Sequence, residues 1–224
     1  MRVSEYINYL VTGDISKLAV SNVGDLSVNP VTLPTDIQIA NQQKIISYLN
    51  LANIAIHKKF QLLKKEFELW SPRDGEEFDL PKDFMTPISA YYAEDKVPVN
   101  IKDHSTNIVD KVDTNVSLLF TDPYKIKIKG VDSLNRNLII LNYAASPARI
   151  TSTSVDLRLP VAYTEAFLNY AAYKAHAAVS ANMQDENNTY YLRYQNSCKE
   201  IMENGLHGNN EIDTNTKLKD RGFV

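Results

Sequence analysis

Apolar residues recur every three or four positions over four stretches of the chain, the spacing that places them on one face of an α-helix. The longest stretch opens with Thr35 and Gln38 in a capping-box pattern and carries a core-facing stripe. This stripe consists of Ile45, Leu49, Ala52, Ile56, Phe60, Leu63 and Phe67. We therefore predict helices at about 4–18, 35–66, 160–182 and 185–205.

Two of these helices carry more apolar surface than a small bundle needs. The helix over 160–182 is apolar around most of its circumference, and such helices are normally packed on several sides. The helix over 35–66 has a second, weaker stripe about 100° away from the first. We predict that both surfaces contact neighbouring subunits, through Tyr48, Leu51, Ala55 and Leu62 on one helix and through Tyr163, Phe167 and Tyr170 on the other.

Between about 67 and 150 the apolar period changes to two, and prolines divide the segment into short pieces, as in an antiparallel sheet. Residues 138–143 are apolar on both faces, which is typical of a central strand. Gly130 and the polar residues after it predict a hairpin that joins strands over 124–129 and 138–143.

The last helix is predicted to begin at the N-cap Asp185 and to bury Tyr191, Tyr194, Cys198 and Ile201. Gly205 predicts a left-handed Schellman closure that folds Leu206 back on Ile201. Residues 206–224 are too polar to fold alone, so they form either a frayed terminus or a tail that a partner orders. We favour the second alternative, with contacts to the partner through Lys217, Leu218, Lys219, Arg221, Phe223 and Val224.

Together these elements predict an α+β protein. A helical bundle carries an inserted antiparallel β region, and both belong to a single domain over 1–205. An extended C-terminal tail follows over 206–224.

The composition excludes several functions. A net charge of −3 over 224 residues gives no general attraction to nucleic acid or to an anionic membrane. Cys198 is the single cysteine, so an intramolecular disulfide is excluded, and no apolar run is long enough for a membrane span. The four histidines lack metal-ligand spacing, and nucleophile-elbow and phosphate-loop patterns are absent. We expect no enzymatic activity, no metal or other cofactor, and no membrane partner.

Three lysines, Lys125, Lys127 and Lys129, alternate with apolar residues and so share one face of a predicted strand. One interpretation is that this face contacts DNA phosphates or the acidic surface of a neighbour. The alternative, which we favour, is the solvated face of an edge strand, where lysine discourages aggregation. The thirteen tyrosines suit core and subunit contacts better than base stacking, because few basic residues accompany them.

The order and spacing of several short motifs resemble those of the head-to-tail adaptor proteins of tailed bacteriophages, of podovirus or crAss-like type. The main motif is Leu159-Pro160, Tyr163, Glu165-Ala166 and then Leu168-Asn169-Tyr170-Ala171-Ala172-Tyr173-Lys174-Ala175-His176. Upstream of it, in the same order as in that family, lie Tyr48-Leu49-Asn50-Leu51-Ala52, Phe67-Glu68-Leu69-Trp70 and Phe78-Asp79-Leu80-Pro81-Lys82-Asp83-Phe84. The resemblance covers residues 35–205.

This resemblance implies a structural protein of the virion neck, assembled in the host cytoplasm. Its expected partners are further copies of itself in a ring, twelve as in that family, the phage portal protein, downstream tail or ring proteins, and the genomic DNA that passes through the lumen. A small DNA-binding or packaging accessory protein that uses the lysine strand and the basic tail is the alternative. A third possibility, an enzyme, has no motif in its favour.

Overall fold

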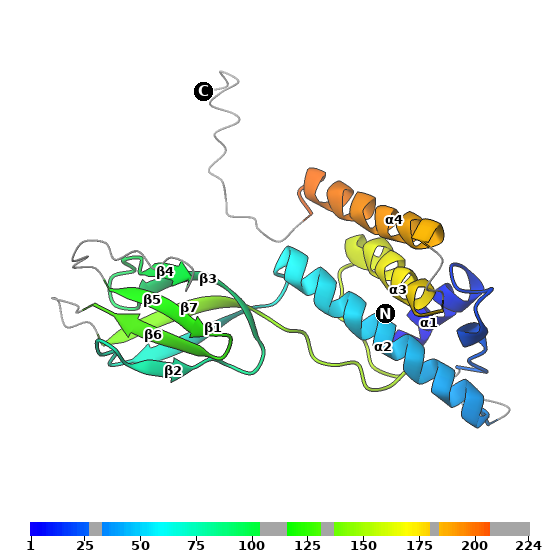
Figure 1. Ribbon diagram of the computed structural model, residues 1–224, viewed down its shortest axis with the longest axis horizontal. Coiled ribbons are helices and arrows are strands. Elements are labelled where there is room, and N and C mark those ends of the chain that lie inside the picture. Colours follow the sequence, from blue (N-terminus) through cyan, green and yellow to red (C-terminus); the bar gives the residue numbers. More distant parts are fainter. Residues whose placement is uncertain (27–32, 104–115, 131–136, 180–183, 207–224) are drawn as a thin grey trace, which may run out of the picture. The chain divides into compact units, whose positions relative to one another are not determined.

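The computed structural model describes residues 1–26, 33–103, 116–130, 137–179 and 184–206, which form two compact units (Figure 1). The helical unit comprises Met1–Phe60 and the described residues from Ala148 onward, and the β unit comprises Gln61–Pro147. The predicted α+β class and the insertion of the β region between helices are confirmed. The single domain over 1–205 stays a prediction, and within it the described chain forms these two compact units.

The helical unit contains α1 (Val3–Thr12), α2 (Asp36–Phe60), α3 (Thr164–Val179) and α4 (Gln184–Glu203). Short 3₁₀ turns occur at Ala19–Ser21 and at Val161–Tyr163, directly before α3. The described α1 is shorter than the predicted 4–18, and α4 begins one residue before the predicted N-cap Asp185.

The start of α2 confirms the predicted capping box. The Thr35 backbone N–H donates to Gln38 Oε1 at 2.8 Å, and the Gln38 N–H donates to Thr35 Oγ1 at 3.3 Å. Each bond satisfies a backbone donor that the first helical turn leaves without a partner.

The predicted end of α2 is wrong. The helix ends at Phe60, Gln61 adopts a positive φ of 48°, and β1 (Lys64–Trp70) begins three residues later. Leu63 and Phe67 therefore do not belong to the helical stripe. Residues 64–70 pair along their whole length with β7 (Leu138–Ala145), so tertiary pairing overrides a spacing that also fits a helix.

Helix α3 is the centre of the helical unit and packs against α1, α2 and α4. Phe167 meets Tyr6 of α1 edge to face at 5.0 Å between ring centroids, and Tyr163 meets Phe60 of α2 in the same way at 5.0 Å. The Tyr163 hydroxyl also donates to the Leu206 carbonyl at 2.8 Å. These contacts bury Tyr163 and Phe167 within their own chain.

The end of α4 confirms the predicted Schellman closure. Gly205 has a φ of 65°, its N–H donates to the Met202 carbonyl at 3.1 Å, and the Leu206 N–H donates to the Ile201 carbonyl at 3.1 Å. A side chain at a positive φ is strained, so glycine is the favoured residue here.

The β unit contains two sheets with a shared apolar core (Figure 1). The first sheet is antiparallel, and β7 lies between β1 and β3 (Phe84–Tyr92), as predicted for a central strand. The second sheet has the order β2 (Glu77–Asp79), β6 (Lys125–Lys129), β5 (Ser117–Asp122) and β4 (Asn100–Asp103).

One prediction for the β region is wrong. Strands β6 and β7 do not form a hairpin, because they lie in different sheets, and β5 with β6 forms the hairpin instead. Its two-residue connection is held by the Tyr124 N–H, which donates to Asp122 Oδ1 at 2.6 Å. The strand pairs of the region are antiparallel, as predicted, except for β4 with β5, which run parallel. A period of two shows which face of a strand is buried but not which strand is its partner.

A carboxylate directly before β3 contacts the other two strands of the first sheet. Asp83 Oδ2 accepts a hydrogen bond from Lys65 Nζ at 2.6 Å, and Asp83 Oδ1 accepts one from the Tyr143 hydroxyl at 3.1 Å. The bond from Lys65 lowers the pKa of Asp83, and burial followed by the bond to Asp83 raises the pKa of Tyr143 to about 12.

These shifts predict how the stability of the β unit depends on pH. A carboxyl whose pKa is lowered by folding stabilises above its unfolded pKa of about 4 and loses this effect as pH falls through the folded value. A phenol whose pKa is raised from about 10 stabilises fully below that value and loses the effect as pH rises towards 12. Asp83→Asn should lower the free energy of unfolding at pH 7 by about 0.5–1 kcal/mol and flatten both slopes.

Urea titrations followed by the fluorescence of Trp70 would measure this effect, because Trp70 is the single tryptophan and lies in β1. Asp79→Asn, which removes an exposed carboxylate of β2, is the matched control and should leave the acid slope unchanged. An unaltered pH profile in Asp83→Asn would contradict the role of this carboxylate.

Candidate protein-interaction surface

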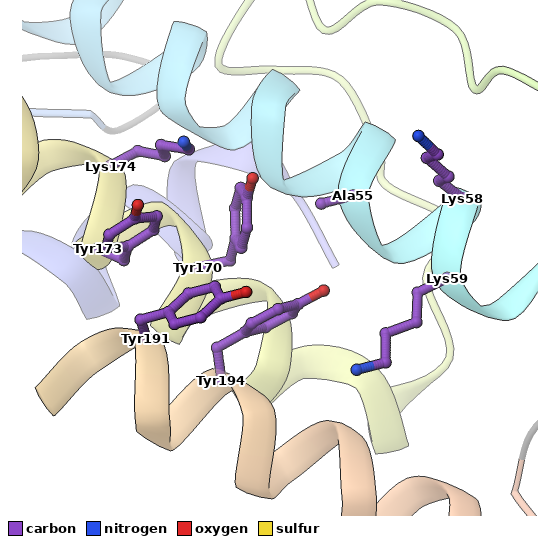
Figure 2. A pocket seen from close by; sticks show the side chains of 8 residues that line it. All are labelled: Ala55, Lys58, Lys59, Tyr170, Tyr173, Lys174, Tyr191 and Tyr194. Atoms are coloured by element: carbon purple, nitrogen blue, oxygen red, sulfur yellow. The ribbon is translucent and has the colours of Figure 1, made fainter. Parts of the chain in front are cut away.

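An open groove of about 550 Å³ lies on the helical unit where α2, α3 and α4 meet (Figure 2). Tyrosines and lysines make up all but one of its lining residues, so we call it the tyrosine–lysine groove. The lining residues are Ala55, Lys58 and Lys59 from α2, Tyr170, Tyr173 and Lys174 from α3, and Tyr191 and Tyr194 from α4.

Helical spacing explains why these residues meet. Tyr170 and Tyr173 are three residues apart on α3, and Tyr191 and Tyr194 are three apart on α4, so each pair lies on one helix face. The buried alanines of α3, which include Ala171 and Ala175, lie on the faces that pack inside the unit. The same helix therefore contributes both to the core and to the groove.

The four tyrosine rings form a closed cycle of contacts. The centroid distances are 5.8 Å for Tyr170 with Tyr173, 5.2 Å for Tyr173 with Tyr191, 5.9 Å for Tyr191 with Tyr194, and 4.9 Å for Tyr194 with Tyr170. Edge-to-face and tilted ring pairs each stabilise by about 0.5–1.5 kcal/mol beyond burial alone. These contacts hold the four rings, which we call the tyrosine wall, in place without a ligand.

The lysines make the groove positive. Lys174 Nζ lies over the rings of Tyr170 at 5.4 Å and Tyr173 at 4.8 Å, and Lys59 Nζ lies over the ring of Tyr194 at 5.4 Å. Lys58 is exposed, and no ion pair to it occurs among the described residues. Because no acidic residue lines the groove, an anionic group of a partner would be attracted to it.

Tyr194 of the groove and the neighbouring Cys198 are held in their neutral forms. Burial raises the pKa of Tyr194, and burial also raises the pKa of Cys198, an effect that the charge of Lys59 partly offsets. A neutral phenol and an inaccessible thiol are neither a base nor a nucleophile at neutral pH. This geometry suits binding, with aromatic area for apolar side chains and ammonium groups for carboxylates.

Two predicted subunit-contact residues come together in the groove, since Ala55 and Tyr170 both line it. Leu51 and Tyr48 lie one and two helical turns before Ala55 on the same face of α2, with Leu51 exposed and Tyr48 half-buried. These four residues border one continuous side of the helical unit. Whether another copy covers them stays a prediction.

Three other predicted subunit-contact residues are placed elsewhere. Tyr163 and Phe167 lie in the core of their own chain, so they are not available to a neighbour. Helical spacing put them on one aromatic edge with Tyr170, but α1, α2 and the end of α4 cover that edge at Tyr163 and Phe167. Leu62 lies in the β unit, because α2 ends before it.

The lysine strand is β6, an inner strand rather than the edge strand that we favoured. Two of its three charges are matched across the sheet, since Lys127 lies opposite Glu77 and Lys125 lies between Asp79 and Asp122. Lys125 Nζ also approaches Glu77 Oε2 at 3.8 Å. Acidic neighbours on both adjoining strands weaken the attraction of this face for phosphates. Its contact with DNA stays a prediction, for Lys129 as for the other two.

The predicted partner contacts at Lys217, Leu218, Lys219, Arg221, Phe223 and Val224 lie outside the described residues. Over the part of the chain that the structure describes, every helix is too short or too polar to cross a membrane. The same residues contain no group of three or more side chains suited to hold a metal ion.

Sequence reasoning missed most of the groove. It assigned Tyr191 and Tyr194 to one buried face, whereas Tyr194 is buried and Tyr191 is exposed. It assigned no role to Lys58. The available signal was the pair of tyrosines at i and i+3 on each of two neighbouring helices, next to lysines.

No model of a known protein family matches this chain, and a search of curated proteins also finds no match.

The core position of Phe167 predicts a stability effect in the isolated chain. Phe167→Ala should lower the free energy of unfolding of the helical unit by about 3–5 kcal/mol, through lost burial and the cavity that remains. Thermal denaturation followed by helical circular dichroism would measure the loss, and Leu192→Ala, at an exposed position of α4, is the control. An unchanged transition in Phe167→Ala would contradict the core assignment.

The burial of Cys198 predicts slow thiol chemistry. Because its thiol is inaccessible and its pKa is raised, reaction with an aromatic disulfide reagent at pH 8 should be at least about tenfold slower in the folded chain than in urea. Leu192→Cys adds an exposed thiol on the same helix and should react at once. Equal rates for Cys198 in both states would contradict its burial.

Proposed function

We propose that this protein is a structural head-to-tail adaptor of a tailed phage, which forms a ring of identical copies between the portal and the tail. In this proposal DNA passes through the ring lumen, and the protein assembles at the virion neck. The role is mechanical rather than enzymatic. The order and spacing of the motifs over residues 35–205 give the proposal its family, and the surface of the helical unit gives it a physical basis.

One observation carries the proposal. Two residues predicted from separate helices to contact other subunits, Ala55 and Tyr170, lie together in the tyrosine–lysine groove. Leu51 extends this surface along α2 and is 46% exposed. Tyrosine and exposed leucine side by side supply the large, amphipathic contact area that protein interfaces use.

Energetic considerations support assembly on a template. A stable lateral contact needs about 800 Å² per partner, and a portal ring would raise the effective concentration of neighbouring copies. Modest contacts between copies would then suffice to close the ring. We therefore expect weak association of the free chain and stable association on the portal.

The alternative of a small DNA-binding or packaging accessory protein has less support. The acids opposite Lys125 and Lys127 reduce the positive potential of that strand face. In the groove, ammonium groups already cover ring faces on which bases would stack.

Assembly gives the direct test. The full chain mixed with the portal of the same phage should show rings by negative-stain electron microscopy. Leu51→Glu places a charge in an apolar contact, so it should reduce the fraction of portals with a complete ring by about tenfold. Leu192→Glu is the matched control, because Leu192 is 54% exposed on α4 and does not line the groove.

Rings that form equally with Leu51→Glu would remove this surface from the interface. Portals that never acquire a ring, together with DNA binding by the free chain that weakens steeply with salt, would favour the accessory-protein alternative.

A further inference from the structure

We propose that the tyrosine–lysine groove of one copy receives the N-terminal end of α2 from a second copy. The contact is head to tail: Leu33 and Ile37 pack on the tyrosine wall, and Asp36 pairs with Lys58. This inference rests on the proposed ring, and it specifies the two surfaces that join neighbouring copies.

The N-terminal end of α2 carries apolar side chains that no described residue of its own unit covers. Leu33 is 89% exposed and Ile37 is 70% exposed, which places both among the most exposed large apolar residues of the described chain. They flank the exposed carboxylate of Asp36 within five residues. Apolar side chains that rim a charge in this way are typical of a contact surface.

This end of α2 is held in a fixed shape. The capping box orders Thr35 and Gln38, and Gln38 Nε2 also donates to Asn22 Oδ1 at 3.2 Å. One turn later, Asn41 Nδ2 donates to the Asn22 carbonyl at 2.9 Å and Gln42 Nε2 donates to the Val23 carbonyl at 2.7 Å. A pre-ordered end loses little conformational entropy when it docks.

The chemistry of the groove complements that of this end. The groove offers an aromatic wall and three ammonium groups without an acidic residue, whereas the end offers two aliphatic side chains and a carboxylate. Lys58 and Asp36 are both exposed, and neither takes part in an ion pair among the described residues.

Nucleic acid fits the groove less well. Lys174 covers the faces of Tyr170 and Tyr173, and Lys59 covers the face of Tyr194, so bases would have to displace them in order to stack. An aliphatic side chain needs only the ring edges and the open volume between them.

The positions of the two surfaces on α2 make the contact head to tail. The complementary surfaces lie at opposite ends of one helix of 25 residues, about 37 Å long at 1.5 Å per residue. A contact between two different surfaces of the same molecule repeats from copy to copy and closes into a ring when the rotation permits. Two copies whose α2 helices run antiparallel would instead make the contact twice and stop at a symmetric dimer, so the ladder of multimers tested below distinguishes a ring from a dimer.

Cysteine crosslinking of full-length chains tests the contact. Ile37→Cys copies mixed with Ala55→Cys copies should give a crosslinked dimer under mild oxidation, about tenfold above the yield of Ile37→Cys mixed with Leu192→Cys. The double variant with both cysteines should give a ladder of multimers. Residues 37 and 55 lie about 27 Å apart along one helix, so a bond between them joins two copies. The wild-type chain, whose Cys198 is buried, is the blank.

Charge reversal adds a second readout. Lys58→Glu alone and Asp36→Lys alone should each lower the crosslinking yield about five- to tenfold at low salt, and the two changes together should restore it. Lys44→Glu makes the same charge change at an exposed position of α2 outside the groove and should have no effect. Circular dichroism of each variant checks that the helices are intact.

Several outcomes would overturn this contact. The contact is wrong if Ile37→Cys crosslinks to Ala55→Cys no better than to Leu192→Cys, or if it crosslinks preferentially to itself. It is also wrong if the double charge reversal fails to restore the yield. Binding of a labelled oligothymidine that Lys58→Glu abolishes would show that the groove binds nucleic acid instead. If rings form on the portal without the crosslink, the contact is wrong and the ring proposal stands. If the crosslink forms but portals acquire no ring, the contact stands and the adaptor function is wrong.

Discussion

The packing of α3 between α2 and α4 is the constraint on which the helical unit depends. Its aromatic and alanine side chains cover most of the helix circumference, so no single neighbour can shield it. Phe167 is shielded inside the unit by Tyr6, and Tyr163, in the turn directly before α3, is shielded by Phe60. Tyr170 and Tyr173 are shielded only in part, by each other and by the tyrosines of α4. The groove is the remaining uncovered part of that same helix.

In the β unit, several charged side chains have partners within the unit itself. Lys65, Asp83 and Tyr143 connect strands of the first sheet, and Lys125 and Lys127 of β6 lie opposite acids of β2 and β5. In the groove, by contrast, the lysines face aromatic rings and no carboxylate. This contrast is why we assign partner binding to the helical unit and not to the lysine strand.

Local signals in the sequence predicted local structure well. Thr35 with Gln38 predicted the start of α2, Gly205 predicted the end of α4, and the doubly apolar run of β7 predicted a central strand, because each feature depends on residues close in sequence. Pairing partners were not predictable in this way. The alternation in β6 fits any neighbouring strand, and only the tertiary structure separates it from β7.

The groove shows a similar limit of sequence reasoning. The spacing of Tyr163, Phe167 and Tyr170 defines one edge of a helix, but it does not reveal where along that edge the chain's own helices end and the open surface begins. Lys58 and Tyr191 become site residues only because α2 and α4 approach α3 from two sides. That approach is a property of the packed unit and not of any single segment.

The central claim is that other copies cover the tyrosine–lysine groove and the adjoining Leu51. Hydroxyl-radical footprinting tests this claim most directly, by comparing the free chain with the chain assembled on a portal. Our account predicts that oxidation of Tyr173, Tyr191 and Leu51 falls several-fold on assembly, while the exposed Tyr124 of the β unit provides an internal reference. Equal oxidation of Tyr173, Tyr191 and Leu51 in the free and assembled states would contradict the account.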